Sequence, residues 1–502
     1  MTQIGLDTQI LLRNALQYIQ TKEFDIAWAL LQKALIRSPN NPEILRILSV
    51  VSALKFDFTS ALELIDRVIS LAPDNGVAHS NRGNILKELH RYEEALESFD
   101  NAIALLPNYA EAYSNKGNAL QELQHYEEAL HWYDRAIALQ PDYAEAYSNK
   151  GNALEWLRRH EQAMENFDRS ISINPQYIDA YWHKALSQLA SGNYQFGWQN
   201  YEARWSKLHP IKFQHSGIPR LQGLDNVADK NILIWAEQGL GDTLQFCRYI
   251  QPLADLGANI TFVVPKALLN ILSSLKSYCK IITQEDGKLG NFDFQSPLLS
   301  LPLLFGTSVD TIPGTPSYLR VDLEKKNIFA PHVVKGKNLK VGLVWNGGFR
   351  VDHPELWEIN KRRNIELELI AELRDIPEID FYSLQKGEPA ESELKSKKDH
   401  LWPNLKNCTG LLDDFSDTAA LIENLDLVIS VDTSTAHLAG ALGKPVWILN
   451  RYDSCWRWLR GRSDTPWYPS ARIYQQTSPG DWRGVIMEVK KDLLALQSNE
   501  KI

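Results

Sequence analysis

The chain has 502 residues, and at roughly 100–200 residues per domain it is long enough for three domains, give or take one. Its 44% apolar and 23% charged residues are globular values, which exclude disordered, collagen-like and coiled-coil classes. The 53 Lys and Arg against 62 Asp and Glu give a net charge of −9 without a basic tail, and this argues against nucleic acid as the main partner.

The start of the chain and its cysteines indicate a compartment. The stretch MTQIGLDTQILLRNALQ lacks the basic and apolar regions of a signal peptide, and no apolar run approaches the roughly 20 residues of a membrane helix. The four cysteines lie far apart in sequence, without the spacing of a zinc ribbon or a redox motif. We therefore expect reduced thiols, no membrane span and a cytoplasmic location.

The N-terminal part of the chain repeats with a period of 34 residues. The recurring residues are Pro39, Pro73, Pro107, Pro141 and Pro175, then Gly83, Gly117 and Gly151, then Ala95, Ala129 and Ala163. A 34-residue helix–turn–helix unit with small residues at the helix crossing and a closing Pro resembles the tetratricopeptide repeat. Because one helix pair cannot bury its own apolar face, the pairs are expected to stack into a superhelix with a concave groove. Three copies are near-identical and the flanking ones are looser, so we predict five to six repeats over residues 1–207.

One polar position recurs on the first helix of three successive repeats. Asn81, Asn115 and Asn149 occupy it, and stacking sets them in a row along the inner face. A carboxamide both donates and accepts hydrogen bonds, so the row suits the main chain of a peptide. It resembles the asparagine ladder of the O-linked N-acetylglucosamine transferases, which implies that it binds a protein acceptor. The alternative is that Asn is a common polar residue here; Ile47 and His183 replace it in outer repeats, so any such groove is short.

The sixth copy departs from the pattern through its aromatic residues. Trp198, Tyr201 and Trp205 crowd the segment SGNYQFGWQNYEARW. We interpret them as packing against the next domain rather than as a cage for a ligand. The stretch that follows is rich in Pro and Gly and predicts a linker over residues 208–229.

After Lys230 the apolar pattern changes from a period of 3.6 to short runs between helical segments. The expected strands are NILIWAE, NITFVV, KIITQ, SPLLSLP, KVGLVWNG, DFYSLQKG, DLVISVD, PVWILN and RIYQQ. They predict two Rossmann-like lobes with parallel sheets, over 230–325 and 338–480, joined by a polar bridge. Residues 481–497 predict a closing helix. Its apolar face comprises Trp482, Val485, Ile486, Val489, Leu493 and Leu496.

Ligands of such sheets bind at the carboxyl ends of strands, so the cleft between the lobes is the expected site. Asp432 ends a buried strand there. Three hydroxyl residues, Thr433, Ser434 and Thr435, open the helix that follows. Free amides at a helix N-terminus and a cluster of hydroxyls suit an anion such as a diphosphate. The alternative is simple N-capping by Thr433 or Ser434, and His437 on the same turns is either a core residue or a ligand contact.

A second turn, AEQGLGDTLQF, follows the first strand of the first lobe. Gly239 and Gly241 permit a tight turn, and Asp242 opens the next helix. A dinucleotide fingerprint needs a third Gly where Leu244 stands, and an acid after the second strand is also missing. These departures argue against NAD or FAD.

These turns resemble those of glycosyltransferase family nine, the ADP-heptose:lipopolysaccharide heptosyltransferases, which have the GT-B fold. The resemblance covers residues 230–497. The family's first-lobe G-D turn, whose Asp is the proposed base, matches Gly241 and Asp242. Its phosphate turn, D-T-x-x-x-H-L-A, matches Asp432, Thr433 and His437. The closest likeness is to bacterial proteins that fuse tetratricopeptide repeats to this domain.

Further site residues follow with less support. The family's basic residue that contacts the diphosphate is matched by Arg363, with Lys361 as the second choice. Gln385 and Lys386 end a second-lobe strand, where contact with a base or ribose is expected. The run Trp456-Arg457-Trp458 is suited either to stacking on a base or sugar or to packing between the lobes. No metal-ligand pattern is visible, which fits a GT-B enzyme that works without a divalent ion or other cofactor.

The sequence therefore predicts an all-α tetratricopeptide-repeat superhelix followed by an α/β GT-B unit of two Rossmann-like lobes. The first hypothesis is an inverting glycosyltransferase that uses a nucleotide-diphosphate sugar and a protein or peptide acceptor held in the repeat groove. The second is an enzyme for a lipid-linked or cell-surface glycan, with the repeats as a docking module. The third is a non-catalytic scaffold, which the presence of Asp242, Arg363 and Asp432 disfavours. Neither the sugar nor the nucleotide follows from the sequence.

Overall fold

The computed structural model describes residues 3–206, 215–286, 290–314, 316–348 and 357–497. The first residues of the predicted linker, 208–214, lie outside them. The chain forms two compact units, Met1–Lys184 and Ala185–Ile502. The second helix of the sixth repeat therefore groups with the α/β part of the chain.

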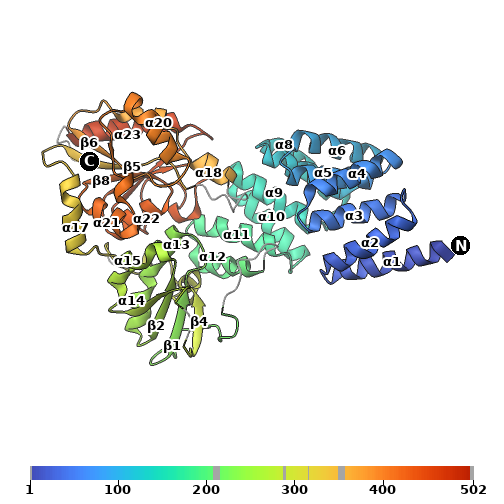
Figure 1. Cartoon of the computed structure of the whole chain (residues 1–502), viewed down its shortest axis with the longest axis horizontal. Helices are drawn as coiled ribbons and strands as arrows, with labels where there is room; N and C mark the ends of the chain where they lie inside the picture. The colour runs from blue at the N-terminus through green and yellow to red at the C-terminus, as the bar shows by residue number, and fades with distance from the viewer. Residues whose placement is uncertain (1–2, 207–214, 287–289, 315, 349–356, 498–502) are drawn as a thin grey trace. The chain divides into compact units, whose positions relative to one another are not determined.

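The first unit is a run of helices packed as consecutive pairs (Figure 1). They are α1 Gln3–Gln20, α2 Phe24–Arg37, α3 Pro42–Leu54, α4 Phe58–Leu71, α5 Gly76–Glu88, α6 Tyr92–Leu105, α7 Ala110–Glu122, α8 Tyr126–Leu139, α9 Ala144–Trp156 and α10 His160–Ile173. The helix α11, Ile178–Ala190, spans the division between the units. The predicted repeat superhelix is confirmed.

Small residues let the two helices of each repeat approach. A Cβ atom on Gly83 would lie 2.5 Å from the ring of Phe99, and one on Gly117 would lie 2.6 Å from the ring of Tyr133. Gly151 stands in the same way against Phe167. Any larger residue at these positions would push the aromatic ring of the second helix out of its place.

Each closing Pro ends its helix, and an ion pair then links one repeat to the next. The residue before Pro107, Leu106, has a non-helical backbone (φ −131°, ψ 76°), because a Pro ring disfavours the helical conformation of its predecessor. Ion pairs between residues 16 positions apart, one on each of two successive helices, recur along the stack. They are Arg82–Asp66, Lys116–Asp100, Lys150–Asp134 and Lys184–Asp168.

The second unit begins with the end of the repeat region and a four-stranded sheet. After α12 Tyr194–Tyr201 and the 3-10 turn η1 Glu202–Trp205, the strands are β1 Asn231–Trp235, β2 Asn259–Val264, β3 Cys279–Thr283 and β4 Phe294–Pro297. All pairs are parallel, in the order β3-β2-β1-β4. The helices between them include α13 Leu240–Phe246, α14 Ile250–Asp255 and α15 Leu269–Leu272, and α16 Leu301–Leu304 follows β4.

The fourth expected strand, SPLLSLP, is wrong in most of its length. The strand ends at Pro297, and the next residues form the turn η5, Leu298–Ser300, and then α16. Leu298, Leu299 and Leu301 are all buried. A short apolar run has no period that separates a buried strand from a buried helix.

The second sheet has six parallel strands in the order β10-β9-β8-β5-β6-β7. They are β5 Leu339–Val344, β6 Ile379–Ser383, β7 Lys406–Asn407, β8 Leu427–Val431, β9 Val446–Asn450 and β10 Ala471–Gln475. The short β7 has no counterpart in the sequence prediction. The helices are α17 Leu323–Phe329 in the polar bridge, α18 Trp357–Arg363, α19 Leu367–Ile370, α20 Ala390–Leu401, α21 Phe415–Glu423, α22 Ser434–Ala441 and α23 Trp482–Gln497. The predicted pair of Rossmann-like lobes is confirmed.

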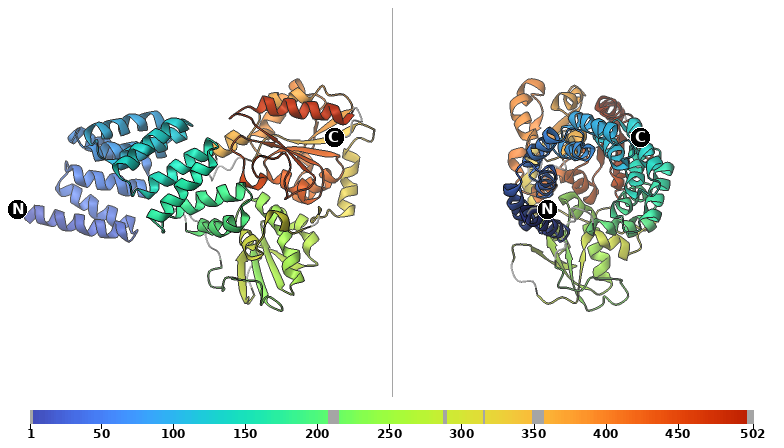
Figure 2. Two further views of the ribbon diagram at one scale, coloured as in Figure 1. Left: turned by 180° about the vertical axis from the view of Figure 1, so that it is seen from behind. Right: turned by 90° about the vertical axis from the view of Figure 1, so that its right-hand side faces the viewer.

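The helix α23 lies along one face of the second sheet (Figure 2). Five residues of its predicted apolar face are buried: Trp482, Val485, Ile486, Val489 and Leu493. The sixth, Leu496, is 41% exposed, which corrects the prediction. It belongs to the last turn of the helix, beyond the last buried residue.

Strand order changes direction beside β1 in the first lobe and beside β5 in the second. At such switch points the loops after neighbouring strands leave the sheet in opposite directions, so ligands bind there. The turns after β1 and β8 carry the predicted site residues.

Candidate functional site

The turn between β8 and α22 presents hydroxyl groups at the start of a helix. Thr433 is the N-cap residue, with an extended backbone (φ −138°, ψ 169°). Its side chain makes no capping bond to an amide of α22, and its hydroxyl lies 3.0 Å from that of Ser430. Capping by the Thr433 side chain therefore does not occur in this structure. Asp432, Ser434 and Thr435 are half-buried around the same turn.

Arg363 reaches this turn from the end of α18. Its Nη1 donates a hydrogen bond to the carbonyl oxygen of Asp432 over 2.9 Å, and its Nη2 donates to the side chain of Asn360. A Cβ atom at position 347 would collide with the guanidinium, so Gly347 is required for this approach. Lys361, the second choice, is exposed. The structure therefore brings Arg363 and the α22 turn together.

His437 is buried behind the turn. Its Nδ1 lies 2.9 Å from the Tyr468 hydroxyl, and its Nε2 lies 3.9 Å from Asp432 Oδ1. The ring stacks on Trp458 with centroids 4.9 Å apart. Burial lowers the pKa of His437 to about 4, although Asp432 opposes this shift, so the imidazole is neutral at pH 7. This geometry is that of a histidine that orients its neighbours within the core.

The first-lobe turn packs directly on α22. A Cβ atom on Gly241 would lie 2.8 Å from the His437 ring, so only glycine permits this approach of α13 to α22. Asp242 Oδ2 accepts the Gly239 N–H bond at 3.1 Å, and its Oδ1 pairs with the Arg457 guanidinium. The helix-capping interpretation of Asp242 is therefore realised in the structure. Both predicted turns meet, although about 190 residues lie between them in sequence.

Arg457 is the partner of Asp242 that sequence reasoning missed. Its guanidinium lies 4.3 Å from the centre of the Trp456 ring, and Nη1 lies 3.1 Å from Cys455 Sγ. Burial acts to lower the pKa of Arg457, but Asp242 and Cys455 outweigh it and hold that pKa well above its usual value. The arginine is thus a fixed positive charge beside the carboxylate. The only signal for it in the sequence is its place in the run WRW after β9.

Trp456 and Trp458 serve the packing alternative considered for the run WRW. Trp456 packs edge-on against Trp198, with ring centroids 5.4 Å apart, and lies 5.7 Å from Tyr201. Both tryptophans of the run are buried. The prediction that the aromatic residues of the sixth repeat pack against the following domain is confirmed for Trp198 and Tyr201, and Trp205 packs on Trp235 of β1.

Gln385 and Lys386 follow the carboxyl end of β6, as predicted, but their side chains bond the protein's own backbone. Gln385 is 1% exposed, and its Oε1 accepts bonds from the Trp345 and Asn346 amides while its Nε2 donates to the Asn346 carbonyl. In this arrangement the carboxamide fixes the loop after β5 and contacts no ligand-facing surface. The exposed Lys386 donates to the Thr409 carbonyl over 3.2 Å.

The asparagine row lies in the first unit, with Asn81 in α5, Asn115 in α7 and Asn149 in α9. Asn115 is buried, and the other two are half-buried. Beside it, Asn118 accepts a bond from the Tyr133 hydroxyl of the same repeat at 2.8 Å. The three residues of the row recur at the same helical position in successive repeats, and their binding role stays a prediction.

Two findings concern only the described residues. None of the helices among them is both long and apolar enough to cross a membrane. Nor do the described side chains include a group of three or more His, Cys, Asp and Glu placed to hold a metal ion. The cytoplasmic location and the independence of metal and cofactor stay predictions.

Family models match both parts of the chain. Residues 83–124 and 117–155 match a TPR repeat model, and residues 144–177 match the tetratricopeptide repeat. Residues 388–479 match glycosyltransferase family 9 (heptosyltransferase). The chain therefore carries tetratricopeptide repeats in its N-terminal region and a C-terminal glycosyltransferase family 9 domain, as the resemblance implied. The matched segment contains the α22 turn and Arg457, whereas Asp242 and Arg363 lie outside it.

Similar proteins add little about function. Protein FlbA of Caulobacter vibrioides is 28% identical over 323 residues, 60% of this chain and 52% of FlbA, so the chain spans about half the length of that relative. A TPR protein of Thermus thermophilus is 22% identical over 36% of this chain and 99% of its own, with a TM-score of 0.34. PilW, a type IV pilus biogenesis factor, is 21% identical over 41% and 94%, with a TM-score of 0.37.

Proposed function

We propose that the protein transfers a sugar from a nucleotide-diphosphate donor to a protein or peptide acceptor held in the groove of the repeats. The observation that carries the proposal is the meeting of the two turns. The helices α13 and α22 are in contact. Asp242 lies in the first turn of α13, and the Arg363–Asp432 contact lies beside the start of α22. The glycosyltransferase family 9 match supports the class of reaction.

The donor diphosphate is assigned to the start of α22. The N-terminus of a helix carries about half a positive charge, and its first amides point away from the helix toward an anion. Arg363 adds a permanent positive charge at the same turn. Thr433, Ser434 and Thr435 supply hydroxyl donors at the same turn. The first amides of α22 are available to the anion as well, because the Thr433 side chain does not cap them.

Asp242 is the proposed general base. As the acceptor hydroxyl oxygen forms its bond to the anomeric carbon, its proton passes to the carboxylate, and the bond from that carbon to the diphosphate oxygen breaks. The nucleoside diphosphate leaves with the bonding electrons, and Arg363 and the α22 dipole stabilise its charge. In the structure Arg457 forms an ion pair with Asp242. A bound diphosphate is a second anion that competes for Arg457, and release from the arginine leaves the Asp242 carboxylate able to accept the proton of the acceptor hydroxyl.

Thermal shift of the full chain with ADP, UDP and GDP tests the donor assignment. A nucleotide at 100 times its dissociation constant should stabilise the fold by roughly 2.7 kcal/mol. At the same nucleotide concentration, Thr433→Val/Ser434→Val should reduce the stabilisation to about 1.4 kcal/mol or less, whereas Ser392→Ala on the exposed side of α20 should leave it intact. If none of the three nucleotides or their sugars raises the melting temperature, the donor assignment is wrong.

Transfer assays then separate the acceptor classes. With the stabilising nucleotide sugar as donor, the protein should transfer sugar to polypeptide acceptors. The rate of this transfer should fall when the asparagine row of the repeats is replaced. Transfer to glycolipid acceptors alone, at a rate unaffected by Asn81, Asn115 and Asn149, would contradict the protein-acceptor proposal and favour the glycan alternative.

A further inference from the structure

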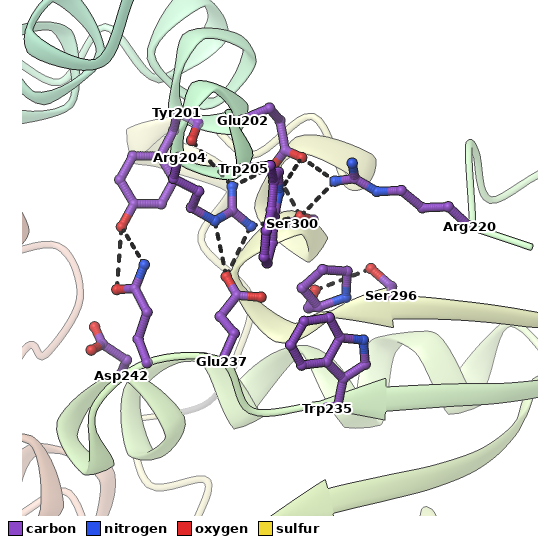
Figure 3. Close-up of polar contacts among 12 residues, drawn as sticks. Tyr201, Glu202, Arg204, Trp205, Arg220, Trp235, Glu237, Asp242, Ser296 and Ser300 are labelled. Carbon is purple, nitrogen blue, oxygen red and sulfur yellow. Dashed lines mark hydrogen bonds and ion pairs between the residues drawn. The ribbon is translucent and has the colours of Figure 1, made fainter. Parts of the chain in front are cut away.

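A buried ion pair joins the end of the repeat region to the first lobe (Figure 3). Arg204 lies in η1, and Glu237 lies two residues beyond the end of β1. Nε and Nη2 of Arg204 donate to the same oxygen of Glu237, Oε1, over 3.0 and 2.8 Å. The side chains are 1% and 0% exposed. Both residues belong to the second unit.

Arg204 is held rigidly by its other contacts. Its Nη1 donates to Glu202 Oε1 over 2.6 Å, and its Nη2 donates to the Ser300 hydroxyl over 2.8 Å. Its guanidinium also lies 4.5 Å from the centre of the Trp205 ring. Because every side of the guanidinium is occupied, the position of Glu237 is fixed against η1 and the turn before α16.

Hydrogen bonds also hold the chain between Glu237 and Asp242. Gln238 exchanges hydrogen bonds with the Tyr201 hydroxyl, at 3.1 and 3.3 Å. Gly239 donates its amide to Asp242. Figure 3 shows Tyr201 and Arg204 above this turn, with Glu237 and Asp242 on the turn itself. Arg204 and Tyr201, at the end of the repeat region, therefore fix Glu237 and Gln238 of this turn. The Asp242 carboxylate fixes the turn's own backbone by accepting the Gly239 amide.

We propose that Arg204 is a positioning residue for Asp242, which it directs by anchoring Glu237 and with it the β1–α13 turn. The inference rests on the proposed function, in which Asp242 is the base. It goes beyond that function because it makes the last element of the repeat region part of the transfer machinery. A distortion of η1 is then transmitted to the carboxylate through the Arg204–Glu237 ion pair and the turn that it anchors.

Stability alone does not account for the pair. Taking two charges out of water costs several kcal/mol for each ion, and well-packed apolar residues often replace such pairs without loss. The other carboxylate oxygen of Glu237, Oε2, is buried and has no hydrogen-bond partner among the described residues. A carboxylate kept there at such a cost is better explained by a directional role, since an apolar side chain would not fix the turn.

The charged groups around Glu237 set the pH at which the anchor weakens. Burial raises the pKa of Glu237 to about 7, and Glu202 and Asp242 act in the same sense, while Arg204 opposes them. Arg220 compensates Glu202 from the other side. Protonation of Glu237 removes its charge, so turnover in the parent should fall as the pH drops through about 7.

The test compares three variants with a matched control. Arg204→Gln and Glu237→Gln should each lower kcat at least about tenfold, with the KM for the donor within about twofold. Arg204→Lys keeps one charged donor and should recover part of the loss. Lys266→Gln is the control, because Lys266 pairs with Glu285 on the exposed surface of the first lobe and lies outside the Arg204 network, and its kcat should stay near the parent value. The inflection near pH 7 should disappear from the kcat profile of Glu237→Gln.

Amide hydrogen exchange of residues 238–244 supplies a readout that needs no activity. Exchange should rise at least about tenfold in Arg204→Gln and Glu237→Gln at unchanged far-UV circular dichroism, and it should not rise in Lys266→Gln. Unchanged exchange in both variants, or an equal kcat loss in the Lys266 control, would overturn the inference. If exchange rises but the parent itself transfers no sugar, the proposed function fails while the anchoring of the turn stands.

Discussion

The Asp242 carboxylate and the Arg457 guanidinium form an ion pair although 215 residues separate them in sequence. The other oxygen of the same carboxylate accepts the Gly239 amide. Asp242 thus links the two lobes and closes its own turn at once. Because one group serves both contacts, Asp242→Asn keeps an acceptor for the Gly239 amide but removes the charge that pairs with Arg457.

Asp242→Asn is the sharpest test of the base. Asparagine caps a helix about as well as aspartate, yet it does not take up a proton at neutral pH. We expect turnover to fall by about 10²–10⁴ while donor affinity measured by calorimetry stays within a few-fold. Turnover close to that of the parent would remove Asp242 as the base and direct attention to the acids of the second lobe.

Breaking the interlobe pair should destabilise the second unit. Arg457→Met leaves the carboxylate without its partner, and removal of one member of a buried pair costs about 3–5 kcal/mol. Denaturant unfolding measures this, and the double variant with Asp242→Asn should recover a large part of the loss. The exposed pair of Arg462 and Asp464 provides the control, since Arg462→Gln should change the unfolding free energy by less than about 1 kcal/mol. Equal losses in the two arginine variants would contradict a special role for Arg457.

The hydroxyls at the start of α22 should matter for nucleotide affinity and not for the fold. Thr433 makes no side-chain cap, so its replacement by Val costs the helix little. Each hydrogen bond lost to a charged phosphate is worth about 1.5–3 kcal/mol, so Thr433→Val/Ser434→Val should weaken binding of the nucleotide by at least about tenfold. Calorimetry checks the affinity, and an affinity equal to that of the parent would take this turn out of the donor site.

The asparagine row is tested by acceptor kinetics. Changing Asn81, Asn115 and Asn149 together to Ala should raise the KM for polypeptide acceptors, because each lost carboxamide removes one hydrogen bond worth about 1 kcal/mol. Hydrolysis of the donor in the absence of acceptor should be unaffected. A triple variant that modifies polypeptides as efficiently as the parent would show the row to be structural.

The neutral state of His437 predicts a dependence of stability on pH. Its pKa is lowered to about 4 by burial, so below pH 6.5 the unfolded chain takes up a proton that the folded protein refuses. Stability is therefore lost as the pH falls from about 6.5 to 4. In His437→Gln this loss should be smaller by about 2 kcal/mol between pH 7 and 4.5, from denaturant unfolding. The exposed His400→Gln should behave as the parent, and an identical loss in both variants would contradict the prediction.

The sequence by itself determined the architecture. The 34-residue period predicted the repeats because each of the three central copies carries its own glycine, aromatic partner and closing proline, as Gly117, Tyr133 and Pro141 do. Short buried runs predicted two parallel sheets, and the turns at their carboxyl ends held Asp242 and Thr433. These are local patterns, set by which side chains a helix or strand buries over a few residues.

Tertiary structure alone decided the partners. Nothing near Arg457 in sequence indicates Asp242, and nothing near Arg204 indicates Glu237, because charges attract in space after the chain has brought its elements together. Gln385 lies at the predicted end of its strand, but its carboxamide bonds the backbone of the loop after β5 instead of facing a ligand site. A residue's position follows from local preference, whereas the direction of its side chain follows from the packing of segments distant in sequence.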